Sequence, residues 1–205
     1  MLEIENFKKS FGTKPLLDIP QLILDQKIYW IKGENGTGKT TLLKCLAGIS
    51  SFCGNITLDQ IALKQQPRKY LQKVNFSQTE PTFPDFLTGM QLIAFFIKAK
   101  QGSFEQINKL LDDFQMKAYI DAQPLATYSS GMLKKLSLIL AFLGKPTVVL
   151  LDEPYISLDL QAIETLNKYL ENMLANKTTV LLTTHLDSLD IPCEIINLEL
   201  LVNHD

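Results

Sequence analysis

The residues with the clearest chemical potential lie in the segment Gly33-Glu34-Asn35-Gly36-Thr37-Gly38-Lys39-Thr40. This segment fits the pattern G-x-x-x-x-G-K-[ST], whose glycines let the backbone curl so that successive N–H groups point at phosphate oxygens. It follows an apolar run that ends at Ile31 and precedes a helical pattern containing Leu42, which is where a phosphate loop must lie. We therefore expect Lys39 to reach the β- and γ-phosphates of a nucleotide and Thr40 to ligate Mg²⁺.

A second candidate group is acidic and follows another apolar run. Asp152 and Glu153 come directly after the run at 148–151. A carboxylate at the end of a buried strand can hold the metal ion beside a phosphate loop, and a neighbouring carboxylate can activate water as a general base. We assign Asp152 to Mg²⁺ and Glu153 to catalysis. The alternative is that the two carboxylates only cap the chain before Pro154.

One of the two histidines, His185, follows the apolar run at 179–182. Ligands of open α/β folds bind at the carboxyl ends of the strands. We expect His185 to contact a γ-phosphate and to take part in catalysis. The alternative is a polar loop residue without a ligand.

These side chains need a parallel sheet to bring them together. Short continuous apolar runs at 28–31, 147–151 and 179–182 are typical of strands buried on both faces. Helical patterns separate these runs, and alternating strands and helices indicate an α/β fold. A small antiparallel sheet is predicted near the amino terminus, where apolar and polar residues alternate at 2–7, 21–24 and 55–59.

The stretch 81–126 differs because its pattern is helical and contains no clear strand. It predicts a helical insertion into the α/β core. We expect a single domain over residues 1–205, with the core and the antiparallel β subdomain in 1–80 and 145–205 and a helical subdomain in 81–144.

The composition excludes several classes of protein. With 205 residues and 46% apolar side chains, the chain can bury one core and is not disordered. Its 20 basic and 22 acidic side chains give no cationic excess, so we expect no nucleic-acid partner. No apolar run is long enough to span a membrane, and the acidic amino terminus is unlike a signal peptide. We expect a cytoplasmic protein without a direct membrane span.

The segment Tyr128-Ser129-Ser130-Gly131-Met132 opens a helix shortly before the acidic strand end. It resembles the signature sequence of ATP-binding cassette (ABC) ATPases, a family in which the phosphate loop is called Walker A and the acidic strand end Walker B. The resemblance extends over almost the whole chain in the expected order. It implies an α/β phosphate-loop NTPase core with a mainly parallel sheet, an N-terminal antiparallel β subdomain and a helical insertion subdomain.

The resemblance also implies roles for residues outside the phosphate loop. Phe11 matches the aromatic residue that stacks on adenine, and Asp159 matches the aspartate loop that follows the acidic pair. Gln78 matches the glutamine that joins the core to the helical region and serves both catalysis and the metal. The expected ATP contacts are Phe11, Gly33, Asn35, Gly36, Thr37, Gly38, Lys39, Thr40, Thr41, Ser129, Ser130, Gly131, Met132 and Asp159.

Two of these assignments are less direct. Gln78 is preferred because a strand pattern at 74–77 precedes it, although three other glutamines lie nearby and a plain surface role is the alternative. In the signature, Ser130 replaces the first glycine of the common family pattern and Met132 replaces the usual glutamine. We expect function to survive these changes with an altered dimer affinity.

In this family, two cassettes pack head to tail so that each ATP lies between one phosphate loop and the partner's signature. The resemblance therefore implies an ATP hydrolase that uses Mg²⁺ and dimerises with a second ABC subunit, either identical or different. It further implies a transporter subunit that powers substrate movement across a membrane, and we favour export. The alternative is a soluble ABC ATPase that acts as an assembly factor without a membrane partner.

A transporter subunit needs integral membrane permease subunits. We expect these subunits to contact the region 82–90, whose aromatic residues need not all be buried. The contact would hold the chain on the inner face of the cell membrane. The alternative for these aromatics is ordinary packing within the helical insertion.

Overall fold

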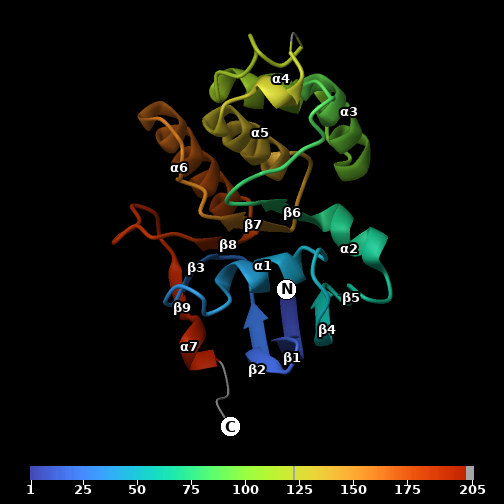
Figure 1. Ribbon diagram of the computed structural model, residues 1–205, viewed down its shortest axis with the longest axis vertical. Coiled ribbons are helices and arrows are strands. Elements are labelled where there is room, and N and C mark those ends of the chain that lie inside the picture. The colour runs from blue at the N-terminus through green and yellow to red at the C-terminus, as the bar shows by residue number, and fades with distance from the viewer. Residues whose placement is uncertain (122, 202–205) are drawn as a thin grey trace.

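The computed structural model describes residues 1–121 and 123–201, and two sheets organise this part of the chain (Figure 1). A five-stranded sheet has the order β6-β7-β8-β3-β9, and its paired strands are all parallel. The predicted parallel sheet is thereby confirmed. Its strands are β3 (Ile28–Lys32), β6 (Val74–Ser77), β7 (Val148–Asp152), β8 (Thr179–Thr183) and β9 (Glu194–Asn197).

The second sheet is antiparallel and has the order β2-β1-β4-β5. It confirms the alternating pattern near the amino terminus, although the strands are longer than that pattern predicts. Its members are β1 (Leu2–Phe11), β2 (Lys14–Leu24), β4 (Cys53–Leu58) and β5 (Ile61–Ala62).

The helices occupy two layers in Figure 1. Helices α3 to α6 cover one face of the parallel sheet, whereas α1 lies between the parallel and the antiparallel sheets. The helical elements are α1 (Lys39–Leu46), α2 (Pro67–Lys73), α3 (Gly89–Lys100), α4 (Phe104–Asp113), the 3₁₀ turn η1 (Leu125–Thr127), α5 (Ser130–Phe142), α6 (Leu160–Ala175) and α7 (Leu198–Leu201).

The central strands of the parallel sheet are buried on both faces, as their continuous apolar runs predict. All five residues of β7 and of β8 are buried. Val149 and Leu151 face the helices α3 to α6, while Val148 and Leu150 face α1 and the antiparallel sheet. The alternation of side chains along a strand thus places the carboxyl end of β7 between two apolar cores.

The predicted helical insertion is present between β6 and β7. Thr88 begins α3 with a capping box, in which its side chain accepts from the Gln91 N–H and the Gln91 side chain accepts from the Thr88 N–H. Over the described part of 81–126, the β-type pairing amounts to one isolated bridge between Thr88 and Pro124. Of the helices described, none combines the length and apolar content needed to cross a bilayer.

Candidate nucleotide-binding site

The glycine-rich segment forms a tight loop between β3 and α1. Gly36 and Gly38 have φ angles of 85° and 101°, in the left-handed region that glycine adopts most readily. Gly38 is also the N-cap residue of α1. Because the buried face of α1 packs between the two sheets, its amino terminus and free N–H groups are held firmly at the loop.

Lys39 extends over this loop. Its Nζ donates to the carbonyl oxygens of Gly33, at 2.7 Å, and Glu34, at 2.9 Å. The Thr37 hydroxyl also donates to the Glu34 carbonyl, at 2.9 Å. The loop therefore presents an ammonium group beside a helix amino terminus, an arrangement suited to a polyphosphate.

The loop opens into a cavity of about 670 Å³. Most of the predicted nucleotide and catalytic residues line this cavity, and Phe11 lies at its rim with 61% of its surface exposed, so its ring is available for stacking. The predicted residues that line it are Phe11, Asn35, Gly36, Gly38, Lys39, Thr40, Thr41, Glu153 and His185.

Asp152, at the end of β7, is buried and receives hydrogen bonds from three threonines. Its Oδ1 accepts from Thr40 at 3.0 Å and from Thr183 at 2.8 Å, and its Oδ2 accepts from Thr79 at 2.7 Å. The three hydroxyls come from the ends of β8 and β6 and from α1. Carboxylate and hydroxyl oxygens are hard donors of the kind that Mg²⁺ prefers, so this donor set fits that ion.

Glu153 lies next to His185 at the cavity wall. The His185 Nε2 is 3.4 Å from the Glu153 Oε1, and the backbone N–H of His185 donates to the Glu153 Oε2 at 3.2 Å. Burial raises the pKa of the Glu153 carboxyl, although the positive potential of His185 opposes that rise. A carboxylate with a raised pKa and a fixed direction is well suited to accept a proton from water.

The backbone at Glu153 is itself unusual. Its φ of 46° lies in the left-handed region, which costs energy for a residue with a side chain. The Glu153 N–H donates to the Thr183 hydroxyl at 3.1 Å, and the side chain accepts from the His185 N–H. The strained turn directs the carboxylate toward the cavity, away from the line of β7.

Gln78 does not line this cavity, and its role in catalysis and at the metal stays a prediction. It lines a separate groove on the helical side, and its backbone carbonyl accepts from Lys134. Thr79 lines the nucleotide cavity instead. Gln78 and Thr79 line different hollows because side chains that follow a strand continue to alternate between its faces. Thr79 could have been found from its position just after the predicted strand 74–77, which parallels that of Asp152 after 148–151.

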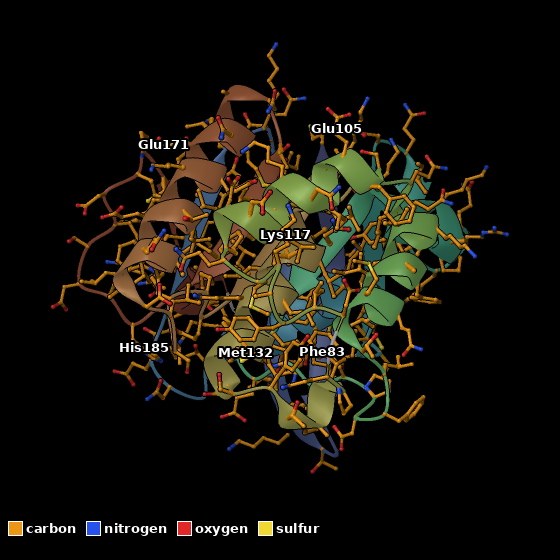
Figure 2. The ribbon with its side chains drawn as sticks, turned by 90° about the horizontal axis from the view of Figure 1, so that it is seen from above. Phe83, Glu105, Lys117, Met132, Glu171 and His185 are labelled. Carbon is orange, nitrogen blue, oxygen red and sulfur yellow. The ribbon has the colours of Figure 1, made fainter. Side chains whose placement is uncertain are left out.

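The signature segment lies outside the cavity of its own chain. Ser129 is the N-cap of α5, and its hydroxyl accepts from the Met132 N–H at 3.2 Å. A Cβ at Gly131 would lie 2.8 Å from the Ser157 carbonyl, so the helix approaches that loop too closely for a side chain. In Figure 2, Met132 and His185 are labelled well apart. None of the residues 129–132 lines the described cavity.

Asp159 also lies outside the cavity and caps α6. Its Oδ1 accepts from the Ala162 N–H at 2.8 Å, and its Oδ2 accepts from the Lys135 ammonium at 2.5 Å. The hydrogen bond from Lys135 lowers the pKa of the Asp159 carboxyl. Lys135 is part of α5, so this ion pair joins the aspartate loop to the helix that carries the signature.

Comparison with known proteins decides the family. A family model described as ABC transporter matches residues 21–156, which is more than half of the chain and includes both the phosphate loop and the acidic pair. The chain belongs to the ABC ATPase family. This ABC ATPase is accordingly an ATP-binding protein that hydrolyses ATP, of the kind that serves transporters.

Named relatives of this ABC ATPase take part in transport. It is 28% identical over 188 residues to the lantibiotic transport ATP-binding protein SrtF of Streptococcus pyogenes, a match that covers 91% of this chain and 80% of SrtF. It is 32% identical over 159 residues to the cytochrome c biogenesis ATP-binding export protein CcmA of Pseudomonas syringae, which covers 76% of this chain and 74% of CcmA.

Solved structures share the fold. One described as the ATP binding subunit of an ABC transporter superposes with a TM-score of 0.83 at 24% identity, over 91% of this chain and 80% of that one. The ATP-binding cassette MJ0796, in a dimeric post-hydrolysis state with ADP and Pi, superposes with a TM-score of 0.78 at 19% identity, over 90% and 88%. These likenesses confirm the predicted phosphate-loop α/β fold.

Proposed function

We propose that this ABC ATPase powers the export of a substrate across a membrane through ATP-driven, head-to-tail dimerisation with a second ABC subunit. One observation carries the proposal. The phosphate loop and Glu153 share a cavity, whereas the N-terminal end of α5, with Ser129, does not line it. A second chain would bring its own α5 to this ATP, and the export role in the name of CcmA favours the direction.

Nucleotide binding would rest on the loop and its rim. The N–H groups at the start of α1 and the Lys39 ammonium would hold the phosphates, and the Phe11 ring would stack on the base. Thr40, Thr79 and Asp152 would hold Mg²⁺, because both hydroxyls already lie within hydrogen-bond distance of the Asp152 carboxylate. The bound ion would neutralise charge on the β- and γ-phosphates.

Hydrolysis would then depend on Glu153 as the general base. The carboxylate is held at the cavity wall, and its raised pKa favours proton uptake from an attacking water. His185 would fix the direction of Glu153 through its N–H and would present its imidazole to the γ-phosphate. Lys39 and the two helix amino termini, one from each chain, would stabilise the charge on the transferred group.

The second subunit would complete the site through its signature segment. The hydroxyl of Ser129 and the free N–H groups that follow it form an anion-binding helix end. ATP bound between the chains would favour the closed dimer by its differential affinity, and hydrolysis would remove that preference. Ser130 adds a hydroxymethyl group at this surface, where the common signature has glycine, and would adjust the dimer affinity.

A permease would dock in the groove of about 770 Å³ on the helical side. Thr82, Phe83 and Leu87 line this groove together with the exposed ring of Phe95. Phe86, close by in the chain, has 81% of its surface exposed. An apolar groove bordered by exposed aromatic rings suits an apolar segment of a membrane protein. We treat residues 81–144 as the helical subdomain that carries both this groove and the signature.

Copurification tests the transporter role. The tagged chain, expressed in its native host and extracted with detergent, should bring down an integral membrane protein. The double variant Phe83→Asp, Leu87→Asp should lose that protein while retaining MgATP binding. Recovery of a complex of soluble proteins without detergent would instead support an assembly factor.

A further inference from the structure

Lys134 is a buried lysine beneath the nucleotide cavity. It lies on α5, has 1% of its surface exposed and ranks among the largest fully buried side chains of the described residues. Its Nζ donates to the carbonyl oxygens of Gln78 at 2.7 Å, Asp152 at 2.9 Å and Thr79 at 3.4 Å. One ammonium group therefore joins α5 to the carboxyl ends of both β6 and β7.

The three acceptors match the chemistry of an ammonium group. A lysine is almost never fully buried without partners, because the desolvated charge is costly. An ammonium group has three N–H donors, and each can meet one of the three carbonyls. Burial lowers the pKa of Lys134 to about 8, and the nearby carboxylates of Asp152 and Glu153 oppose that change. The side chain thus remains largely protonated near neutral pH.

Two of these carbonyls belong to residues of the proposed Mg²⁺ site. The side chains of Thr79 and Asp152 belong to the proposed Mg²⁺ site, and Lys134 donates hydrogen bonds to the backbone carbonyls of both residues. Ser129 of the signature segment is the N-cap of the same helix, five residues before Lys134. That separation is about 7.5 Å along a helix axis, so the two ends of this stretch move together.

We propose that Lys134 is a positioning residue for ATP hydrolysis. It fixes the strand ends that carry Thr79 and Asp152 and links them to the signature segment. This proposal rests on the proposed function, because the signature is taken to act on the ATP of a second chain. Lys134 does not itself line the cavity, and its hydrogen bonds to Gln78, Thr79 and Asp152 do not involve the phosphate loop. Lys134 therefore acts on the geometry of the site. Its loss should lower kcat and leave nucleotide affinity nearly unchanged.

Lys100 supplies a matched control at the opposite end of β6. It comes from α3, and its Nζ donates to the carbonyls of Val74, at 2.8 Å, and Leu71. Burial lowers its pKa to about 8 as well. The two lysines therefore share their chemistry and a bridge from the helical region to β6, although Lys100 is only partly buried. They differ in which end of the strand they hold.

The experiment compares Lys134→Met, Lys134→Gln and Lys100→Met in the full chain. MgATP turnover gives kcat and KM, a fluorescent ATP analogue gives the dissociation constant, and thermal melting gives stability. We expect Lys134→Met to lower kcat by at least about tenfold, a rise of about 1.4 kcal/mol in the barrier, with nucleotide affinity within about threefold. Lys134→Gln, whose amide retains two N–H donors, should recover part of kcat. Lys100→Met should lose stability but keep kcat within about threefold.

Several outcomes would overturn the positioning role. These are a kcat for Lys134→Met close to that of the natural chain, an equal loss of kcat in Lys100→Met, or a change confined to nucleotide affinity. If Lys134→Met does not fold, Lys134→Gln decides, and full activity in that variant at reduced stability would refute the proposal. A natural chain that binds MgATP but does not hydrolyse it would contradict the proposed function itself.

Discussion

The Thr79 hydroxyl donates a 2.7 Å hydrogen bond to the Oδ2 of Asp152, across the carboxyl ends of neighbouring strands. Strand β6 pairs with β7 so that Ser77 lies opposite Leu151, and the chain beyond each strand brings these two side chains together. The Asp152 carboxylate is thereby shared between the phosphate loop, through Thr40, and the segment that leads into the helical region. These hydrogen bonds therefore link the phosphate loop to the helical region through Asp152.

Thr79→Val should weaken Mg²⁺ binding because it removes this hydroxyl with little change of shape. We expect kcat to fall about tenfold at limiting Mg²⁺, in the range typical for outer-shell groups of metal sites. The measurement is ATP turnover titrated with Mg²⁺. Gln78→Ala, which alters the neighbouring side chain on the groove side, should have a much smaller effect. The reverse ranking of the two variants would support the predicted role of Gln78 at the metal.

Lys39→Ala should abolish detectable nucleotide binding. The ammonium group lies over the loop, where the phosphates are expected to bind. Binding of a fluorescent ATP analogue in the presence of Mg²⁺ is the measurement. Lys44→Ala, on the same helix but in its last turn, serves as the control and should bind normally. Unchanged affinity in Lys39→Ala would refute the phosphate-loop assignment.

Ser129→Arg should impair dimerisation in trans. A bulky cation at the start of α5 would occupy the surface that meets the partner's ATP. Chains carrying Glu153→Gln, mixed with chains carrying both Glu153→Gln and Ser129→Arg, should form fewer dimers in MgATP by analytical ultracentrifugation. Ser129→Ala, which also removes the helix cap, isolates the effect of bulk and charge. Equal dimer yields with Arg and Ala would leave the signature without a role in trans.

Lys100 should make stability depend on pH above neutrality. Its pKa is about 8 in the folded chain against 10.5 ordinarily, so between these values the unfolded state binds more protons. The free energy of unfolding therefore rises with pH in this window. The difference in stability between the natural chain and Lys100→Met should grow by on the order of 1 kcal/mol from pH 7.5 to 9.5 in urea titrations.

Lys98→Met is the matched control for that measurement, because Lys98 is exposed on the same helix. Its stability difference from the natural chain should stay constant over the same pH range. A constant difference for Lys100→Met as well would show that the Lys100 ammonium remains charged throughout.

Local patterns predicted much of this molecule. The phosphate loop and the strands β3, β7 and β8 have strong signals because a continuous apolar run and a fixed glycine spacing act over a few residues. Strand β9 was not predicted, since it lies at the sheet edge and its residues are largely exposed. An edge strand depends on its neighbour in space, and the sequence pattern carries little trace of that contact.

The remaining site residues depend on long-range geometry. The side chain of Thr79 points to the cavity because of the exact register after β6, where a shift of one residue reverses the direction. Lys134 sits among apolar helical positions, and its acceptors Gln78 and Thr79 are 56 and 55 residues away in the chain. Two adjacent lysines, Lys134 and Lys135, lie between Leu133 and Leu136. The sequence does not show which of them is buried, and the partners of Lys134 could come only from the fold.

The central claim is that ATP joins two of these chains and that Glu153 ends the association by hydrolysis. Glu153→Gln keeps the shape of the site but removes the base, so it should hold the ATP-bound dimer. Static light scattering in excess MgATP should give twice the chain mass of 23.1 kDa. Glu171→Gln, an exposed change on α6, should show no lasting dimer because it still hydrolyses ATP. A monomer for Glu153→Gln under these conditions would contradict the account.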